Sequence, residues 1–274
     1  MTDQAEWEGR VGRKWADEWR RTDRSFASLT ARLFDAAAEA PYTRVLDVGC
    51  GAGEVSLALA RSNPGSKVIG VDVSSELVET ARERGDGVPN LSFELADAAL
   101  WERSGFAPDL IVSRHGVMFF PDPTEAFAHF ARIAAPGARL AFTCFRAVED
   151  NAWAFGLGAL LPDGLGAPPP PGQPGPFSFA DDNRVRRILA DAGWRDAAFE
   201  PVDFPYVAGA GDDAVEDALS YFLVIGPAAR AAAELAGEAR AAFVARVRDF
   251  LRGQLHDRCV ALGAAAWLVR ARLP

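Results

Sequence analysis

The 274-residue sequence has few cysteines and histidines, and these shortages exclude several classes of protein. Its three cysteines are widely spaced and odd in number, which fits a reducing cytoplasm better than a disulfide scaffold. With only three histidines and no C-x-x-C pair, we expect no metal site. No apolar run is long enough to span a bilayer, and the acidic N-terminus lacks the apolar segment of a secretory signal. We therefore expect a cytoplasmic protein without a membrane span.

The sequence also has fewer basic than acidic residues. The net charge is -9 at pH 7, with 29 Lys and Arg against 38 Asp and Glu. Because Lys and Arg drive binding to phosphate backbones by displacing counterions, a nucleic-acid partner is disfavoured. Lys14 and Lys67 are the only lysines, and this preference for Arg, together with abundant Ala, Gly and Pro, indicates a GC-rich bacterial genome. We therefore expect a small-molecule partner, and the composition leaves a homodimer open.

The residues that are present predict an α/β fold. Apolar residues make up 49% of the chain and charged residues 24%, which is typical of a protein with a packed core. From residue 44 onward, apolar strand segments alternate with helical segments, the pattern of a parallel sheet covered by helices. The expected strands cover 44–48, 67–72, 91–96, 108–113 and 138–145, and the helices between them cover 53–62, 75–84 and 124–134.

Segments of a different character flank this alternation. Residues 6–40 carry aromatic and apolar residues at helical spacing and predict one or two amphipathic helices. After residue 146 we expect a proline-rich loop at 167–176, a helix at 181–192, a strand at 196–206, two or three helices within 212–252 and a last strand at 264–272. We expect a single domain over 1–274, with an N-terminal helical cap (1–40), a cofactor-binding core (41–146) and two lid or substrate insertions (147–180 and 212–255).

The most informative stretch is VLDVGCGAGE at residues 45–54, which reads as a strand, a glycine turn and the start of a helix. Glycines allow positive φ and close approach of the backbone to a ligand, and a helix N-terminus offers free N–H groups. The spacing is G-x-G-x-G, and Glu54 stands where a dinucleotide fingerprint needs its last glycine. The preceding Asp47 suits a ligand that carries an ammonium group and no phosphate, such as S-adenosylmethionine (SAM).

Acidic residues follow at two further strand ends. Asp72 closes the second strand, where a carboxylate can accept hydrogen bonds from both hydroxyls of a ribose. Asp97 closes the third strand and is suited to accept from an adenine amino group, with Val73 and Ala98 as apolar walls for the ring. The alternative for the glycine loop, a tight turn without a ligand, does not explain this recurrence of carboxylates.

With these three strand ends, the sequence resembles the class I SAM-dependent methyltransferases. The family pattern also covers PDLIVS (108–113) and APGARL (135–140), so the resemblance spans residues 42–145. Ala138 stands where the family often has a second glycine, a departure that affects a turn and leaves the cofactor motifs intact. The runs at 112–123 and 264–269 are similar to bacterial small-molecule methyltransferases of the quinone-biosynthesis type.

The resemblance implies a Rossmann-like α/β sheet of seven mostly parallel strands with helices on both faces, an antiparallel last strand and helical lid additions. It places Asp47 and the neighbouring glycine backbone at the methionine moiety, Asp72 at the ribose and Asp97 at the adenine. The full set of candidate cofactor-binding residues is Asp47, Gly49, Cys50, Gly51, Asp72, Val73, Asp97, Ala98, Ser113, Arg114 and Trp19. Gly53 would start the following helix.

His115 is the candidate catalytic residue, because it follows the fourth strand at the edge where ligands of open α/β sheets bind. A neutral imidazole can take a proton from an acceptor hydroxyl or amine during methyl transfer. The alternative is a histidine hydrogen-bonded in a packed loop. His129 and His256 fall on a helix and in the late insertion, and we interpret both as packing or surface residues.

Two further candidates have competing interpretations. Arg114 is suited to pair with an acidic substrate or with Asp122, and we favour a structural ion pair. Trp19 either covers the cofactor, whose sulfonium cation is attracted by an aromatic face, or anchors an N-terminal helix on the core. The same choice applies to Trp15 and Phe26, and to the aromatic residues of the two insertions, for which core packing is the default: Trp153, Phe155, Phe177, Phe179, Tyr206, Tyr221 and Phe222.

The sequence therefore predicts an enzyme that transfers a methyl group from SAM to a small, hydrophobic or aromatic acceptor and releases S-adenosylhomocysteine (SAH). Positioning, exclusion of water under a lid and proton removal by His115 would be the contribution of the protein. Two alternatives remain open: a SAM-binding protein without transfer activity, and a SAM-using enzyme of non-methylating chemistry.

Overall fold

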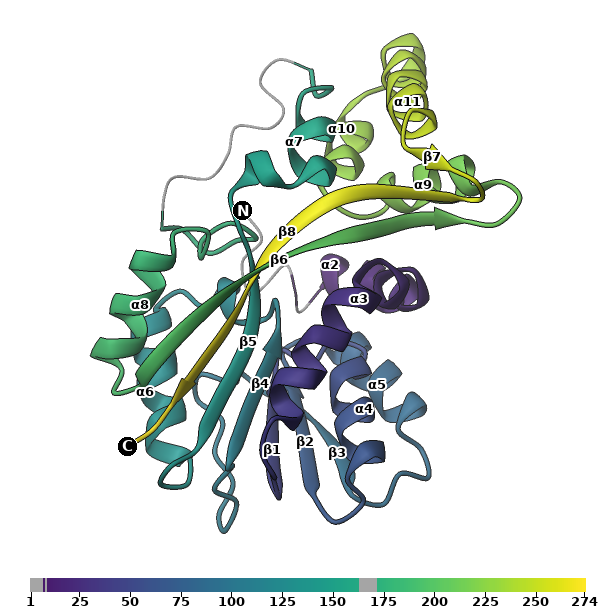
Figure 1. The fold of residues 1–274 in the computed structure, drawn as a ribbon. Coiled ribbons are helices and arrows are strands. Elements are labelled where there is room, and N and C mark those ends of the chain that lie inside the picture. Colours follow the sequence, from purple (N-terminus) through teal and green to yellow (C-terminus); the bar gives the residue numbers. More distant parts are fainter. Residues whose placement is uncertain (1–6, 8, 163–171) are drawn as a thin grey trace.

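One sheet of eight strands carries the fold (Figure 1). The computed structural model describes residue 7, residues 9–162 and residues 172–274. The strands are β1 (Arg44–Val48), β2 (Lys67–Asp72), β3 (Leu91–Leu95), β4 (Leu110–Arg114), β5 (Arg139–Phe145), β6 (Arg195–Ala210), β7 (Leu255–His256) and β8 (Cys259–Arg272).

Seven of these strands lie in the order β3-β2-β1-β4-β5-β8-β6, and the two-residue β7 pairs with β8. The first five strands run parallel to one another, whereas β8 is antiparallel to both of its long neighbours, β5 and β6. This confirms the expected sheet of seven mostly parallel strands with an antiparallel last strand. The short β7 was not predicted.

The two late strands are longer than the sequence predicted, at 16 residues for β6 and 14 for β8. Proline interrupts a central strand because it has no N–H for the ladder, but it is tolerated on an edge strand. β6 is the last strand of the sheet, and Pro201 and Pro205 both lie within its pairing with β8. The position of β6 at the edge of the sheet therefore explains why the strand predicted at 196–206 tolerates both prolines.

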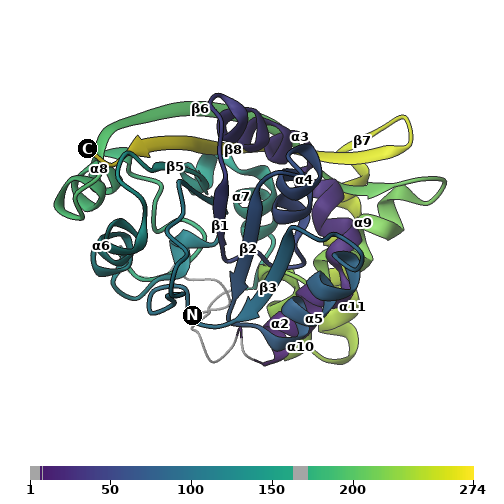
Figure 2. The same cartoon turned by 90° about the horizontal axis from the view of Figure 1, so that it is seen from below.

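Helices cover both faces of the sheet, as expected (Figure 2). The helices α3 (Trp19–Ala38), α4 (Glu54–Ser62) and α5 (Ser75–Arg84) lie on one side, and α6 (Pro123–Ile133) and α8 (Asp182–Asp191) on the other. Helix α6 begins where the sequence requires, because Pro123 occupies its first position and the Asp122 carboxylate accepts a hydrogen bond from the Glu125 N–H at 3.0 Å.

A second group of helices lies beyond the carboxyl ends of the parallel strands (Figure 1). It contains α7 (Ala152–Gly158), α9 (Ala214–Phe222), α10 (Pro227–Glu234) and α11 (Gly237–Arg252), and α7 contacts both α10 and α11. Single 3-10 turns cover Val117–Phe119 and Val148–Asp150. The late segment thus holds three helices, the upper number expected.

The N-terminal segment forms α2 (Arg10–Asp17) and α3, the upper number of the one or two amphipathic helices expected. Helix α2 packs on α5, and α3 crosses the sheet to reach β6. Half of the expected proline-rich loop at 167–176, residues 167–171, lies outside the described residues. Within the described part of the chain, no helix is both long and apolar enough to span a membrane.

Candidate functional site

The glycine loop between β1 and α4 has the left-handed backbone that its sequence predicts. Gly49, Gly51 and Gly53 have φ values of 63°, 53° and 84°, and Gly53 is the N-cap of α4. The N–H groups of Gly49 and Cys50 both donate to the Val71 carbonyl oxygen, at 2.9 and 3.1 Å. A Cβ on Gly51 would meet no atom within 4 Å, so space for a ligand lies directly beside the loop.

Asp72 joins this loop to the end of β2. One carboxylate oxygen accepts from the Gly51 N–H at 2.8 Å, and the other accepts from the Ser74 N–H at 3.0 Å. A carboxylate oxygen can accept more than one hydrogen bond, so Asp72 has the chemistry to accept from a ligand hydroxyl as well. Burial raises the pKa of Asp72 above its ordinary value, although backbone hydrogen bonds from Ser74, Gly51 and Val73 work against this shift.

Asp47 lies deeper, below the glycine loop. Its side chain accepts a hydrogen bond from the Ser56 hydroxyl at 2.5 Å, and only 1% of the residue is exposed. Burial raises the pKa of Asp47 to about 6, and the Ser56 hydrogen bond and the charge of Arg114 oppose this rise. At neutral pH, a cation bound nearby would therefore relieve an unfavourable buried negative charge.

The end of β3 brings the third group of candidates to the same edge. The Ala96 N–H donates to the Asp72 carbonyl oxygen at 3.0 Å, which holds the ends of β2 and β3 together. Asp97 is half-buried, and one of its carboxylate oxygens accepts from the Ala99 N–H at 2.9 Å. Val73 is also half-buried, and Ala98 is buried.

Two predicted cofactor-binding side chains point away from this edge. The Cys50 side chain packs in a small apolar cluster with Val78, Ala81 and Phe93. The Ser113 hydroxyl donates to the Val48 carbonyl oxygen at 2.7 Å and accepts from the Gly116 N–H at 3.1 Å, and Ser113 is fully buried. Ser113 therefore ties the end of β4 to the end of β1.

Gly116 was not predicted as a site residue, although it shapes the same loops. Its φ of -75° is open to any residue, so close packing explains the glycine. A Cβ on Gly116 would lie 2.7 Å from the Val48 carbonyl oxygen and 3.0 Å from the Gly49 Cα. The signal in the sequence was a glycine two residues after the fourth strand, opposite the glycine loop.

His115 is held in an unusual state beside these loops. It has a φ of 63°, which is rare for a residue with a side chain. Its ring stacks on Phe145 with centroids 4.1 Å apart, and neither ring nitrogen has a hydrogen-bond partner among the described residues. Burial, together with the charge of Arg114, lowers the pKa of His115 to about 3, so the ring is neutral at physiological pH.

An aromatic cluster extends from His115 toward α9. The Phe26 ring lies 5.2 Å from both the His115 ring and the Tyr206 ring, and the Phe145 ring lies 5.0 Å from Trp153. Most of these aromatic residues were candidates from the sequence, whereas Phe145 was not. Phe155, by contrast, is 56% exposed. We define the aromatic cluster as Phe26, Phe145, Trp153, Phe177 and Tyr206.

The expected pairing of Arg114 with Asp122 is wrong. Asp122 instead caps α6, whereas the Arg114 guanidinium forms an ion pair with Glu54 and donates to the Thr30 hydroxyl at 2.8 Å. A second carboxylate, that of Asp23, lies 3.8 Å from the same guanidinium. The interpretation of Arg114 as a structural ion pair therefore holds with different partners.

Trp19 begins α3 next to the glycine loop. The Arg84 guanidinium lies 3.8 Å above its ring and donates to the Ala52 carbonyl oxygen at 2.7 Å. His129, as expected for a packing residue, is buried and hydrogen-bonds the Trp101 carbonyl oxygen through Nε2 at 2.7 Å. Within the described ranges, no group of three or more His, Cys, Asp or Glu residues is arranged to hold a metal ion.

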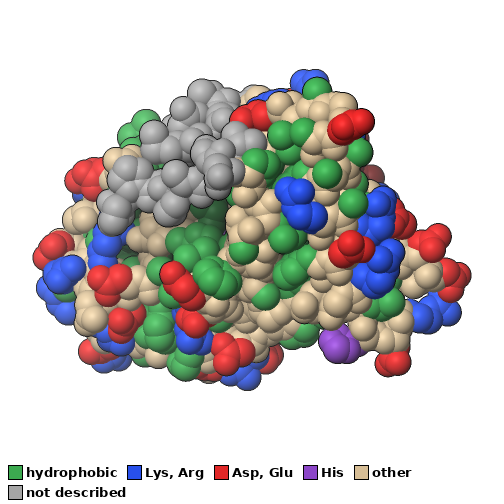
Figure 3. Space-filling view, turned by 90° about the horizontal axis from the view of Figure 1, so that it is seen from above, with side chains coloured by type: hydrophobic (Ala, Val, Ile, Leu, Met, Phe, Trp, Pro, Cys, Tyr) green, Lys and Arg blue, Asp and Glu red, His purple; other side chains and the backbone are tan. Residues whose placement is uncertain are grey.

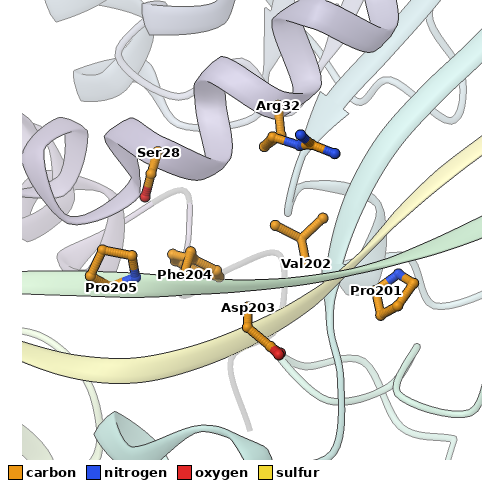
Figure 4. Close-up of a pocket in the computed structure, with 7 residues that line it drawn as sticks. All are labelled: Ser28, Arg32, Pro201, Val202, Asp203, Phe204 and Pro205. Atoms are coloured by element: carbon orange, nitrogen blue, oxygen red, sulfur yellow. The ribbon is translucent and has the colours of Figure 1, made fainter.

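A shallow groove of about 300 Å³ opens elsewhere, between α3 and β6 (Figure 4). Ser28 and Arg32 line it from α3, and residues 201–205 line it from β6. None of these was a predicted site residue. The face over the carboxyl ends of the strands looks different: seen from above, apolar side chains gather around a hollow in it (Figure 3).

Comparison with known sequences agrees with this geometry. A family profile described as a methyltransferase domain matches residues 40–161. A trans-aconitate 2-methyltransferase of Methylobacterium radiotolerans is 32% identical over 232 residues, which cover 82% of this chain and 69% of that protein. The aklanonic acid methyltransferase DauC of Streptomyces sp. is 37% identical over 125 residues, which cover 43% of this chain and 55% of that protein.

Solved structures share the fold at lower identity. The YcgJ protein of Bacillus subtilis superposes with a TM-score of 0.56 and 19% identity, covering 90% of this chain and 98% of that chain. The phosphoethanolamine N-methyltransferase 2 of Haemonchus contortus, solved in complex with phosphomonomethylethanolamine and S-adenosylhomocysteine, has a TM-score of 0.54 and 16% identity. That superposition covers 95% of this chain and 57% of the other.

Proposed function

Because this chain belongs to the class I SAM-dependent methyltransferases of small molecules, we propose that it methylates an uncharged, aromatic acceptor bound beside His115. The observation that carries this proposal is the aromatic cluster, which lies against the His115 ring at the edge of the sheet that holds the glycine loop. Aromatic side chains pack well on flat, apolar molecules.

We call the carboxyl ends of β1, β2 and β3, with the glycine loop, the cofactor edge. The residues there fit SAM. The open space beside Gly51 and the carboxylate of Asp72 suit a ribose, and Asp97 suits an adenine amino group. The buried charge of Asp47 suits the ammonium group of the methionine moiety. Glu54, at the first position of α4, would repel a phosphate there. Val73 and Ala98 would flank the adenine, and Trp19 would close the edge from α3.

The cofactor, when bound, supplies an electrophilic methyl group, which an acceptor atom attacks in line to leave SAH. His115 contributes an unprotonated ring nitrogen at every physiological pH, because its pKa is about 3. Such a nitrogen accepts a hydrogen bond from an acceptor hydroxyl and fixes its direction. A group with so low a pKa is a weak proton acceptor, so we favour orientation by His115 over general-base catalysis.

The charges around His115 bear on the acceptor class. The ring itself is neutral, and the nearby Arg114 guanidinium is already paired with Glu54 and Asp23. A carboxylate placed here would lose its hydration without gaining a free cation as partner. We therefore expect the acceptor to differ from the tricarboxylate that the name of one relative implies, and to be closer to a phenol or a polyketide.

The test is methyl transfer by the purified protein from SAM to a panel of hydroxylated aromatic compounds, with trans-aconitate included. We expect SAH formation with a mass gain of one methyl group on an uncharged aromatic acceptor, and no turnover of trans-aconitate. Efficient methylation of trans-aconitate would contradict the acceptor class. SAH binding without transfer to any compound would favour a non-catalytic SAM-binding protein, and a product without the added methyl would favour another chemistry.

The role of His115 is tested by two variants. His115→Ala removes the ring, whereas His115→Asn tolerates the left-handed backbone and keeps a hydrogen-bonding side chain. If His115 orients the acceptor, His115→Ala should lower kcat/KM about 10- to 100-fold and His115→Asn should retain most of the activity. Equal losses in both variants, with SAH affinity unchanged, would support a general base instead.

A further inference from the structure

Four charged side chains form a closed set between α3 and the cofactor edge. The Asp23 carboxylate lies 2.6 Å from the Arg84 guanidinium and 3.8 Å from that of Arg114, which also pairs with Glu54. Their side chains are only 15–22% exposed. Ion pairs with this degree of burial are screened less than surface pairs. We call Asp23, Glu54, Arg84 and Arg114 the charged clasp.

The charged clasp joins three segments that matter for the reaction. Arg84 donates to the Ala52 carbonyl oxygen in the glycine loop at 2.7 Å. Glu54 is the first residue of α4, directly after that loop. Arg114 ends β4 and immediately precedes His115. Asp23, on α3, lies near the guanidinium groups of both Arg84 and Arg114. Without Asp23, the carboxylate of Glu54 would be the only one of the charged clasp left to balance these two positive charges.

The same turn of α3 also reaches the helix on the acceptor side. Arg21 and Arg24 form ion pairs with Asp217 of α9, at 3.0 and 2.8 Å. The Thr22 hydroxyl lies 3.3 Å from the Tyr221 hydroxyl, which in turn lies 3.1 Å from that of Tyr206 in the aromatic cluster. One turn of a helix thus contacts the cofactor loop and the acceptor side together.

We propose that Asp23 is a positioning residue that fixes α3 across the glycine loop and so couples cofactor binding to the placement of α9 beside the acceptor. The effect of Asp23 on cofactor and acceptor binding rests on the proposed function. Removal of Asp23 leaves two partly buried guanidinium groups with a single carboxylate, and breaking one partner of a buried pair is more costly than its net contribution suggests. The expected result is a displaced α3 and a looser glycine loop.

The test compares Asp23→Asn with Asp35→Asn, an exposed position on the same helix. The first measurement is amide hydrogen exchange without ligand over residues 49–54 and 214–222. We expect faster exchange in both segments for Asp23→Asn and wild-type exchange for Asp35→Asn. Unchanged exchange in Asp23→Asn, or faster exchange confined to α3, would overturn the proposal.

The second measurement is SAH affinity by titration calorimetry. We expect Asp23→Asn to raise the Kd about tenfold and Asp23→Glu, which keeps the charge, to restore most of the affinity. A lower melting temperature with wild-type affinity would overturn the positioning role, because it would show a purely structural contribution. If Asp23→Asn does not fold, Arg84→Lys keeps the charge but loses the forked contact, and it should shift both measurements in the same direction. Wild-type behaviour of Arg84→Lys would then overturn the proposal.

These measurements distinguish an error in the proposed role of Asp23 from an error in the proposed function. If the wild-type protein binds no SAH, the proposed function is wrong, while the exchange experiment without ligand still decides whether Asp23 holds α3 and the glycine loop together.

Discussion

Acidification should weaken cofactor binding, because Asp47 must be ionised to attract the ammonium group of SAM or SAH. Its pKa is about 6 in the ligand-free protein, where burial raises it. A bound cation favours the carboxylate form and lowers this pKa in the complex. The free protein then holds a proton that the complex releases, so affinity rises with pH up to about 6 and is constant above it.

The size of the effect follows from the pKa. One pH unit below a pKa of about 6, roughly ten of eleven Asp47 side chains are protonated, so SAH affinity should fall about tenfold between pH 7.5 and pH 5. Titration calorimetry over this range gives the Kd, and runs in buffers of different ionisation enthalpy give the released protons. Asp72 also has a raised pKa, so a variant is needed to assign the effect.

Asp47→Asn supplies that assignment. The variant should bind SAH weakly at all pH values and lose most of the pH dependence, whereas Ser56→Ala, which removes a hydrogen bond that favours the carboxylate, should shift the dependence to higher pH. Retention of the full pH dependence in Asp47→Asn would refute the reasoning. So would a wild-type affinity that is the same at pH 5 and pH 7.5.

The same pKa makes a prediction about stability. A carboxyl group whose pKa is raised in the folded state binds extra protons there, so stability falls as pH rises from about 4 to about 6. Above that window the ionised Asp47 costs up to about 3 kcal/mol in the ligand-free protein. Asp47→Asn should therefore raise the melting temperature at pH 7.5 while it weakens binding. A lower melting temperature would show that the carboxylate is structurally required.

Two glycines give the remaining predictions. Gly116→Ala places a Cβ 2.7 Å from the Val48 carbonyl oxygen, so it should push the two loops apart, cost about 1–3 kcal/mol of stability and weaken SAH binding at least tenfold. Gly12→Ala places a Cβ against the Ser74 side chain and the Trp7 carbonyl oxygen, so it should displace α2 from the turn after β2, lower the stability and weaken SAH binding. Gly158→Ala, with no atom within 4 Å of the new Cβ, is the control for both, and equal SAH affinity in all three variants would contradict the packing argument.

The core of the fold was predictable because its signals are local. The strand expected at 67–72 is present as Lys67–Asp72, and the helix expected at 75–84 as Ser75–Arg84. Each is a short apolar or amphipathic run bounded by turn residues, so neighbouring residues fix it without tertiary information. The late strands extend beyond their predicted limits of 196–206 and 264–272 because their pairing with each other, which no local signal encodes, continues through Gly209 and Gly263.

The two halves of the candidate site also differ in whether neighbouring residues or long-range packing form them. The cofactor half is built from backbone turns and the carboxylates that follow them, so spacing along the chain located Asp47, Asp72 and Asp97 at one edge. The acceptor half depends on side chains that are far apart in sequence, such as Phe26 and Phe145. Their meeting depends on where α3 and the late segments pack, and no spacing encodes that. The partners of Arg114 were missed for the same reason.

His115 concentrates two unfavourable features in one residue. A side chain in the left-handed region costs on the order of 1 kcal/mol, and a buried ring without a hydrogen-bond partner in the described part of the chain costs a further 1–3 kcal/mol. Stability alone would favour a glycine or an asparagine at this position. An acceptor hydroxyl that bonds to the ring would remove the second cost on binding and convert it into affinity. Such an outlier therefore supports a functional role for His115 more strongly than its position in the sequence did.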